Sequence, residues 1–153
     1  MATVSVTAVF KCDVEKVWST VTSFEEYSWR SDLSKIEVLG ETQFIEHTKD
    51  GYATKFTVTE KEPFKLWEFD METNNIKGHW VGLFSESCGE TTINFTECVT
   101  AKKFFMKPFI KVYLKRQQAL YMFFLEKALS GKKETNFYKA SVENAADYES
   151  SDG

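Results

Sequence analysis

Glu97 is the residue whose type and position most suggest acid–base chemistry. It shares the parity of Ile93 and Phe95 in a stretch that alternates as a β-strand does, so its carboxyl should point to the apolar face. A carboxyl buried there without a cation has a raised pKa and can act as a general acid or base. The alternative is that Glu97 lies at the end of its strand and reaches water, without a catalytic role.

Gln117 is a second polar residue at a position where the pattern predicts burial. At about 100° per residue, it falls in the middle of a wide apolar arc of a predicted helix. An unpartnered buried amide costs roughly 1–3 kcal/mol. We therefore expect Gln117 either to bond a sheet side chain such as Tyr52 or Glu97, or to face a cavity. The arc comprises Phe109, Ile110, Tyr113, Leu114, Leu120, Tyr121, Phe124, Leu125 and Ala128, and the water-facing side Lys111, Lys115, Gln118 and Glu126.

Other reactive side chains form no recognisable catalytic or metal-binding pattern. The two histidines, His47 and His79, have no partner at the spacing of a catalytic triad, and there is no GxSxG sequence. The HExxH, paired CxxC and glycine-rich nucleotide patterns are also missing, so we expect no metal and no cofactor. The carboxylates at 68, 70 and 72 alternate with Trp67 and Phe69, which indicates a solvated strand face rather than an acidic site.

Length and composition predict one soluble domain. The chain has 153 residues and a net charge of −4, without the basic stripe that nucleic-acid binding requires. Three cysteines, Cys12, Cys88 and Cys98, cannot all pair within one chain, and we expect free thiols in a cytoplasmic protein. No apolar run approaches the roughly 20 residues of a membrane span, so we expect no integral membrane association.

The elements that must position these residues follow from periodicity. Strands alternate with period two and helices repeat their apolar residues at three and four, and capping residues such as Asp13 and Ser23 mark helix starts. A polar segment at 132–153 lacks apolar periodicity, and we expect it to form a mobile tail beyond a domain at 1–131. The predicted strands are 3–10, 36–39, 42–48, 52–59, 66–73, 77–86 and 91–99, and the predicted helices are 13–22, 24–27 and 104–131.

Three stretches resemble the START-like, helix-grip superfamily, also called SRPBCC, which includes polyketide cyclase/dehydrase and pollen-allergen proteins. They are VEKVWSTVTSFEEYSWRSDL at 14–33, EKEPFKLWEF at 60–69 and GHWVGLFSESCGETTINFTE at 78–97. The resemblance implies an α+β fold, in which a curved antiparallel sheet of about seven strands and two short helices accompany a long C-terminal helix over the concave face.

The same resemblance implies a cavity between the long helix and the sheet. We expect it to bind a small hydrophobic molecule, such as a lipid or a polyketide-like compound. Two alternatives remain open: a cyclase or aromatase that uses the cavity, with Glu97 as the candidate catalytic group, and a protein-interaction module of the co-chaperone kind. The expected lining residues are Phe56, Trp67, Phe69, Trp80, Phe84, Phe95, Tyr113, Gln117, Leu120 and Phe124.

Overall fold

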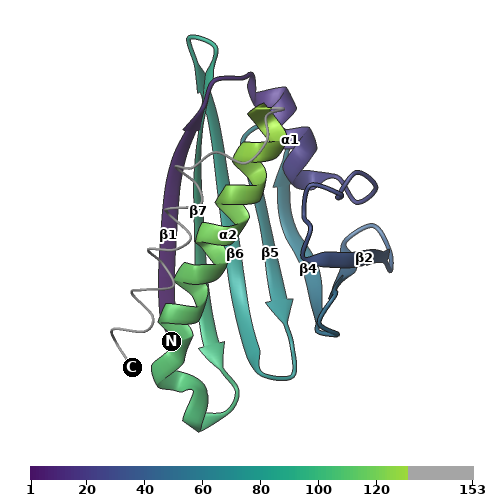
Figure 1. The fold of residues 1–153 in the computed structure, drawn as a ribbon, viewed down its shortest axis with the longest axis vertical. Helices are drawn as coiled ribbons and strands as arrows, with labels where there is room; N and C mark the ends of the chain where they lie inside the picture. The colour runs from purple at the N-terminus through teal and green to yellow at the C-terminus, as the bar shows by residue number, and fades with distance from the viewer. Residues whose placement is uncertain (131–153) are drawn as a thin grey trace.

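The computed structural model describes residues 1–130. The predicted tail at 132–153 and the boundary at 131 lie outside the described residues. Within them, one short helix and one long helix accompany a seven-stranded sheet, which confirms the predicted helix-grip architecture (Figure 1). The elements are β1 (Ala2–Phe10), α1 (Val14–Thr22), β2 (Leu33–Val38), β3 (Gln43–Thr48), β4 (Ala53–Glu62), β5 (Leu66–Glu72), β6 (Ile76–Ser87), β7 (Glu90–Ala101), the 3-10 helix η1 (Phe104–Phe109) and α2 (Ile110–Ser130).

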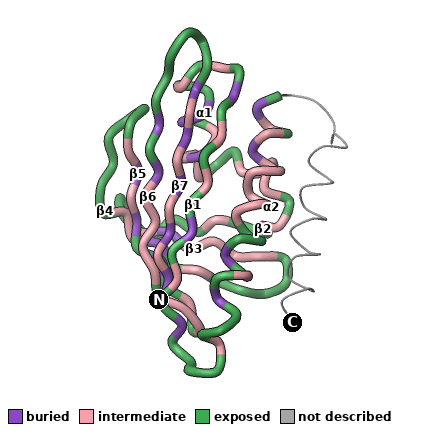
Figure 2. Tube along the Cα trace, turned by 90° about the vertical axis from the view of Figure 1, so that its left-hand side faces the viewer, coloured by how far each residue is buried: buried purple, intermediate pink, exposed green. Residues whose placement is uncertain are grey.

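The sheet is antiparallel throughout, in the order β1-β7-β6-β5-β4-β3-β2. Consecutive strands from β2 to β7 pair with each other, because tight turns join them, and β1 completes the sheet by pairing with β7. Gly51 has a φ of 90° in the β3–β4 turn, a conformation that favours glycine. On β7 the residues of one parity, from Thr91 to Ala101, are buried and face the helices, as strand alternation predicts (Figure 2).

Helix α1 closes one end of the sheet. Asp13 caps it by accepting a hydrogen bond from the Lys16 backbone N–H at 2.9 Å, and Val17, Trp18 and Val21 form its buried face. The Lys16 ammonium also donates a hydrogen bond to the Leu129 carbonyl at 2.9 Å. This bond joins α1 to the C-terminal end of α2.

The predicted second short helix at 24–27 is wrong. The chain there forms bends and turns, although the Ser23 hydroxyl does accept hydrogen bonds from the backbone N–H groups of Glu25 and Glu26 at 3.3 and 2.9 Å. A four-residue segment gains too few helical hydrogen bonds to offset the cost of nucleation. The bends instead let Phe24 pack on Phe44, with ring centroids 4.6 Å apart.

The predicted single helix at 104–131 is two elements. The 3-10 helix η1 contains Pro108, and the α-helix begins only at Ile110. Since a 3-10 helix has about three residues per turn, the 100° phase of the wheel does not extend through it. Phe109, which the wheel placed on the core-facing arc, is 69% exposed.

Helix α2 packs on the sheet through a narrower stripe than the wheel predicted. Ile110, Leu114, Leu125 and Leu129 are buried, and among the strands the helix contacts β1 most extensively. Gln118 lies within this stripe and donates a hydrogen bond to the Val4 carbonyl at 3.4 Å, so the expectation that it faces water is wrong. Four further residues of the predicted arc, Tyr113, Leu120, Tyr121 and Phe124, line an open cavity beside this stripe.

Candidate ligand cavity

An open cavity of about 1820 Å³ lies between α2 and the concave face of the sheet. Its sheet wall is aromatic, because alternate positions on β3 to β7 present large rings to the same side. Of the expected lining residues on the sheet, the cavity is lined by Phe56, Trp67, Phe69, Trp80 and Phe95. Of those on the helix, it is lined by Tyr113, Gln117, Leu120 and Phe124.

The rings of the sheet wall hold one another in place. Trp80 stacks on Phe69 with centroids 4.7 Å apart and planes 6° apart, and it contacts Phe95 at 4.7 Å. Gly82 makes room for this indole, since a Cβ there would come within 2.5 Å of the Trp80 ring. Phe44 and Phe56 form a second stacked pair at 4.8 Å. The wall therefore offers flat, preorganised apolar surfaces.

Phe84 does not line the cavity, although it was expected to do so. Its ring packs edge-on against Trp18 of α1 at 5.0 Å and against Phe95 at 5.6 Å. Parity places Phe84 correctly on the inner face of β6. It lies at the end of the strand that α1 covers, however, and α1 fills the space that a cavity would occupy there.

Gln117 faces the cavity rather than a partner on the sheet. Its side chain is exposed, and it makes no hydrogen bond to any of residues 1–130. The expected alternative, a structural bond to Tyr52 or Glu97, is not formed. The amide avoids a desolvation penalty because it borders open space.

Glu97 lies on the inner face of β7, between Val4 of β1 and Trp80 of β6 in the register of the sheet. It is 9% exposed, lines the cavity and has no hydrogen bond or ion pair with the described residues. Burial raises the pKa of its carboxyl to about 7. The alternative of a strand-end position is therefore wrong, since β7 continues to Ala101.

Tyr113 of α2 also lines the cavity, and its phenol interacts electrostatically with the Glu97 carboxyl. Partial burial raises the Tyr113 pKa, and the charge of Glu97 raises it further. The phenol therefore stays protonated at neutral pH and can donate a hydrogen bond. Together, Glu97 of β7 and Tyr113 of α2 provide a proton-exchanging group and a hydrogen-bond donor in the lining of the cavity.

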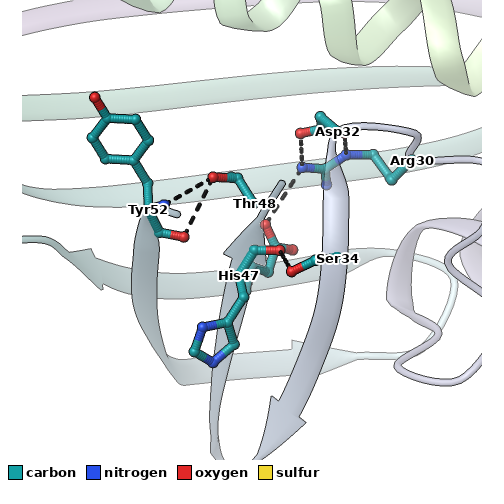
Figure 3. Close-up of polar contacts among 7 residues, drawn as sticks. Arg30, Asp32, Ser34, His47, Thr48 and Tyr52 are labelled. Carbon is teal, nitrogen blue, oxygen red and sulfur yellow. Dashed lines mark hydrogen bonds and ion pairs between the residues drawn. The ribbon is translucent and has the colours of Figure 1, made fainter. Parts of the chain in front are cut away.

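A second polar group on the cavity wall was not predicted from the sequence. Arg30 forms an ion pair with Asp32 at 3.0 Å and reaches Glu46 of β3 at 3.5 Å (Figure 3). Its guanidinium also lies 5.1 Å from the centre of the Tyr121 ring of α2. Backbone hydrogen bonds from Arg30 to the Tyr27 carbonyl and from Leu33 to the Arg30 carbonyl fold the preceding loop so that the side chain points inward.

In this buried cluster, the charge of Arg30 is balanced by the carboxylates of Asp32 and Glu46. Burial alone would lower the Arg30 pKa, but the Glu46 and Asp32 carboxylates outweigh that effect and raise it. Burial raises the Glu46 pKa, and Arg30 opposes the rise. Burial also raises the pKa of Tyr121, which stays a neutral phenol. The available sequence signal was weak: Arg30 and Asp32 are charged residues in a loop beside Trp29.

The two histidines lie outside the cavity. On the outer face, His79 bonds Asp70 at 2.7 Å and Glu68 at 3.1 Å, and the bond to Asp70 is the main reason for its raised pKa. His47 bonds Glu37 at 3.1 Å. The carboxylates at 68 and 70 are thus held by a histidine on the outer face of the sheet, as their parity predicted.

Three further features of the described residues bear on the predicted chemistry. No cluster of three or more metal-ligating side chains occurs within residues 1–130. None of the described helices is both long enough and apolar enough to cross a membrane. Cys12, Cys88 and Cys98 are free thiols in this structure.

A comparison with protein families shows the family to which this chain belongs. A family model described as polyketide cyclase / dehydrase and lipid transport matches residues 1–126. The chain belongs to this family. This match confirms the family resemblance seen in the sequence. The description of the family associates it with polyketide and lipid compounds and names no specific ligand. No curated protein matches the chain.

Solved structures show the same fold at low sequence identity. A START superfamily protein from Mycobacterium smegmatis is 15% identical with a TM-score of 0.75, and the match covers 84% of this chain and 97% of that one. CalU16 from Micromonospora echinospora is 12% identical with a TM-score of 0.68, covering 97% and 86%. The Aha1 dimer from Colwellia psychrerythraea is 17% identical with a TM-score of 0.63, covering 84% and 96%. These likenesses establish the fold alone.

Proposed function

We propose that the protein binds a small, mainly apolar molecule in the cavity beneath α2, with a polar group of the ligand directed at Glu97 and Tyr113. The observation that carries this proposal is the open space of about 1820 Å³ against a stacked aromatic wall. An exposed apolar surface of this kind has a hydration cost that a bound apolar molecule removes. Membership of a polyketide cyclase and lipid transport family supports the same ligand class.

The shape of the wall favours ligands with a flat or elongated apolar body. Stacked rings such as Trp80 on Phe69 present faces and edges that fit the planar ring or the extended chain of a polyketide-like or lipid molecule. The lining also contains charged and polar groups, among them Arg30, Glu46 and Glu97, and we expect these to orient a polar part of the ligand. Affinity should therefore depend mainly on the rings, and ligand preference on Glu97, Tyr113 and Gln117.

Native mass spectrometry of the purified full chain tests for a retained small molecule, and titration with a neutral, polarity-sensitive dye tests the cavity. Gln117→Trp should fill part of the space and lower dye affinity by roughly tenfold, without lowering the melting temperature, because position 117 borders open space. Leu83→Trp, on the outer face of β6, is the matched control and should bind the dye as the native protein does. Equal dye affinity in both variants would place the binding site elsewhere.

A second candidate function is acid–base catalysis on a ligand held in the cavity. It is favoured by one observation, the Glu97 carboxyl with a pKa of about 7 in a site that also contains the Tyr113 phenol. Glu97 would remove a proton from the carbon beside a ligand carbonyl, and the phenol would donate a hydrogen bond to the carbonyl oxygen. Exchange of such protons in deuterated water, measured with native protein and with Glu97→Gln, tests this reaction. Equal exchange rates would exclude it.

The second alternative from the sequence, an interaction module with a vestigial cavity, required a filled core. The described residues enclose a large open space instead, so this alternative has no support from the cavity. An exposed apolar patch was its other requirement, and such a patch is present at η1.

A further inference from the structure

The most exposed aromatic residues of the described chain gather in η1. Phe104, Phe105 and Phe109 are exposed by 83%, 69% and 69%. Exposing three phenyl rings within six residues is unfavourable in water, since phenylalanine has no polar group to offset the hydration of its ring. We call this segment, Lys102 to Lys111, the aromatic–basic segment.

The same segment is strongly basic in a chain that is acidic overall. Lys102, Lys103, Lys107 and Lys111 flank the rings, and the sequence contains no acidic residue from Lys102 to Leu125, although the whole chain has a net charge of −4. The Lys107 ammonium lies 5.6 Å from the centre of the Phe104 ring, and Lys102 pairs with Glu72 at 3.0 Å. The segment therefore combines apolar rings with a local excess of positive charge.

The position of the segment suits contact with a large surface. Figure 1 shows η1 at one extremity of the long axis of the molecule, where the chain turns from β7 into α2. It also borders the cavity, because Lys103, Met106 and Phe109 contribute to the cavity lining. A surface that met this end of the protein would lie beside these lining residues of the cavity.

We propose that the aromatic–basic segment docks the protein onto an anionic lipid surface, with the phenylalanine rings in the acyl boundary and the lysines at the headgroups. Alternating rings and lysines are what an interfacial segment requires, since apolar burial and attraction to anionic headgroups act together. Phe104 and Phe105 are exposed and do not line the cavity, so their rings are available for insertion. Two copies meeting through this segment would bring their lysine clusters together, which opposes self-association.

Docking there would place this part of the cavity lining beside the bilayer and provide a route for an apolar ligand between membrane and cavity. This step goes beyond ligand binding and can fail independently of it. Phe104 and Phe105 do not line the cavity, so a dye titration without vesicles should be the same for the native protein and for variants at these two positions.

The test is cosedimentation of the full chain with vesicles of phosphatidylcholine alone and of phosphatidylcholine mixed with phosphatidylserine. We expect binding to the anionic vesicles, weakened by added salt, and much weaker binding to the neutral ones. Phe104→Ser combined with Phe105→Ser should reduce binding by roughly tenfold or more, because two exposed phenyl rings of the segment are lost. Lys103→Glu combined with Lys107→Glu should reduce it at least as much.

Matched controls separate docking from general loss of apolar surface or charge. Leu83→Ser removes an exposed apolar side chain from the outer face of β6, and Lys35→Glu with Lys61→Glu reverses two exposed lysines on β2 and β4. Both should bind vesicles as the native protein does. Equal binding by every variant, or no binding to anionic vesicles, would overturn the proposal. So would binding that depends on the lysines but not on the rings.

Two measurements on the Phe104→Ser, Phe105→Ser variant test whether another part of the chain or a second copy covers these rings instead of a membrane. Its melting temperature should equal that of the native protein, because exposed rings contribute little to folding. A drop of several degrees would mean that another part of the chain or a second copy covers the rings, and would overturn membrane docking. Sedimentation velocity should show the same molecular mass for both proteins, and a native dimer that the variant cannot form would equally overturn it.

Discussion

Glu46 of β3 and Glu97 of β7 are carboxyls on the sheet side of the same cavity, and their surroundings differ. Glu46 lies 3.5 Å from the Arg30 guanidinium, which also holds Asp32 at 3.0 Å (Figure 3). Glu97 has no cation and no hydrogen-bond donor among the described residues. Burial raises the pKa of both groups, but only for Glu46 does a neighbouring charge oppose it. An ion pair thus stabilises the β3 part of the cavity lining, whereas the Glu97 carboxyl of β7 has no partner among the described residues and can meet a ligand.

The largest effect on stability should come from breaking the Arg30–Glu46 ion pair. Arg30→Met leaves Glu46 buried without its cation, so the free energy of unfolding at pH 7 should fall by about 3 kcal/mol. The loss should shrink at acid pH, where protonation neutralises the stranded carboxyl. Denaturant midpoints across pH measure both effects.

Adding Glu46→Gln to Arg30→Met should recover part of the lost stability, because it removes the unpaired charge. Arg30→Met with native stability at neutral pH would show that the ion pair does not stabilise this part of the cavity lining. In that case the two carboxyls would be equivalent and the comparison would fail.

The next effect should come from neutralising the free carboxyl. Glu97 has a folded pKa of about 7 against an ordinary value of 4.5, so the native fold retains a proton that the unfolded chain releases. The native protein should therefore lose stability as pH rises from about 4.5 through 7, by up to roughly 3 kcal/mol. Glu97→Gln should lack this decline and be the more stable protein at pH 8. Parallel pH profiles for the two proteins would mean that Glu97 is not desolvated.

The smallest effects should separate two neighbouring amides of α2. Gln117→Leu should change stability by less than about 1 kcal/mol, since its side chain borders the cavity, but should alter affinity for an apolar probe with a polar head. Gln118→Leu is the matched control: it loses the hydrogen bond to the Val4 carbonyl and should destabilise by about 1 kcal/mol with unchanged probe affinity. Reversed results would mean that Gln117 has the structural role.

Strand parity predicted the sheet side of the cavity because successive side chains of a strand point to opposite faces. Trp67, Phe69 and Glu97 could therefore be assigned to the inner face from the alternation alone, whereas the alternation at 77–86 grouped Trp80 with Phe84 without deciding which way that face points. Phe84 shares this parity, but depth along the strand decided its environment, since α1 covers that end of the sheet. Parity determines a face and carries no information about what covers it.

The helix and the loops were predicted less well, for reasons that lie outside any local pattern. An amphipathic arc of about 160° leaves the rotation of a helix undetermined, and contact with β1 selected the stripe containing Gln118 instead of Gln117. Pro108 lies inside the segment predicted as one helix, and neither the 3-10 helix η1 nor the exposure of Phe104 and Phe105 was predicted there.

The sequence by itself determined the order of the seven strands and which residues of a strand share a face, because these depend on neighbours two positions apart. Three of its stretches also indicated the family. The tertiary structure alone decided which part of the apolar arc packs and which opens onto the cavity. It also decided the union of Arg30, Glu46 and Tyr121, which come from a loop, a strand and a helix far apart in the chain. Such contacts depend on how whole elements pack against one another, and the local periodicity of the sequence does not predict this packing.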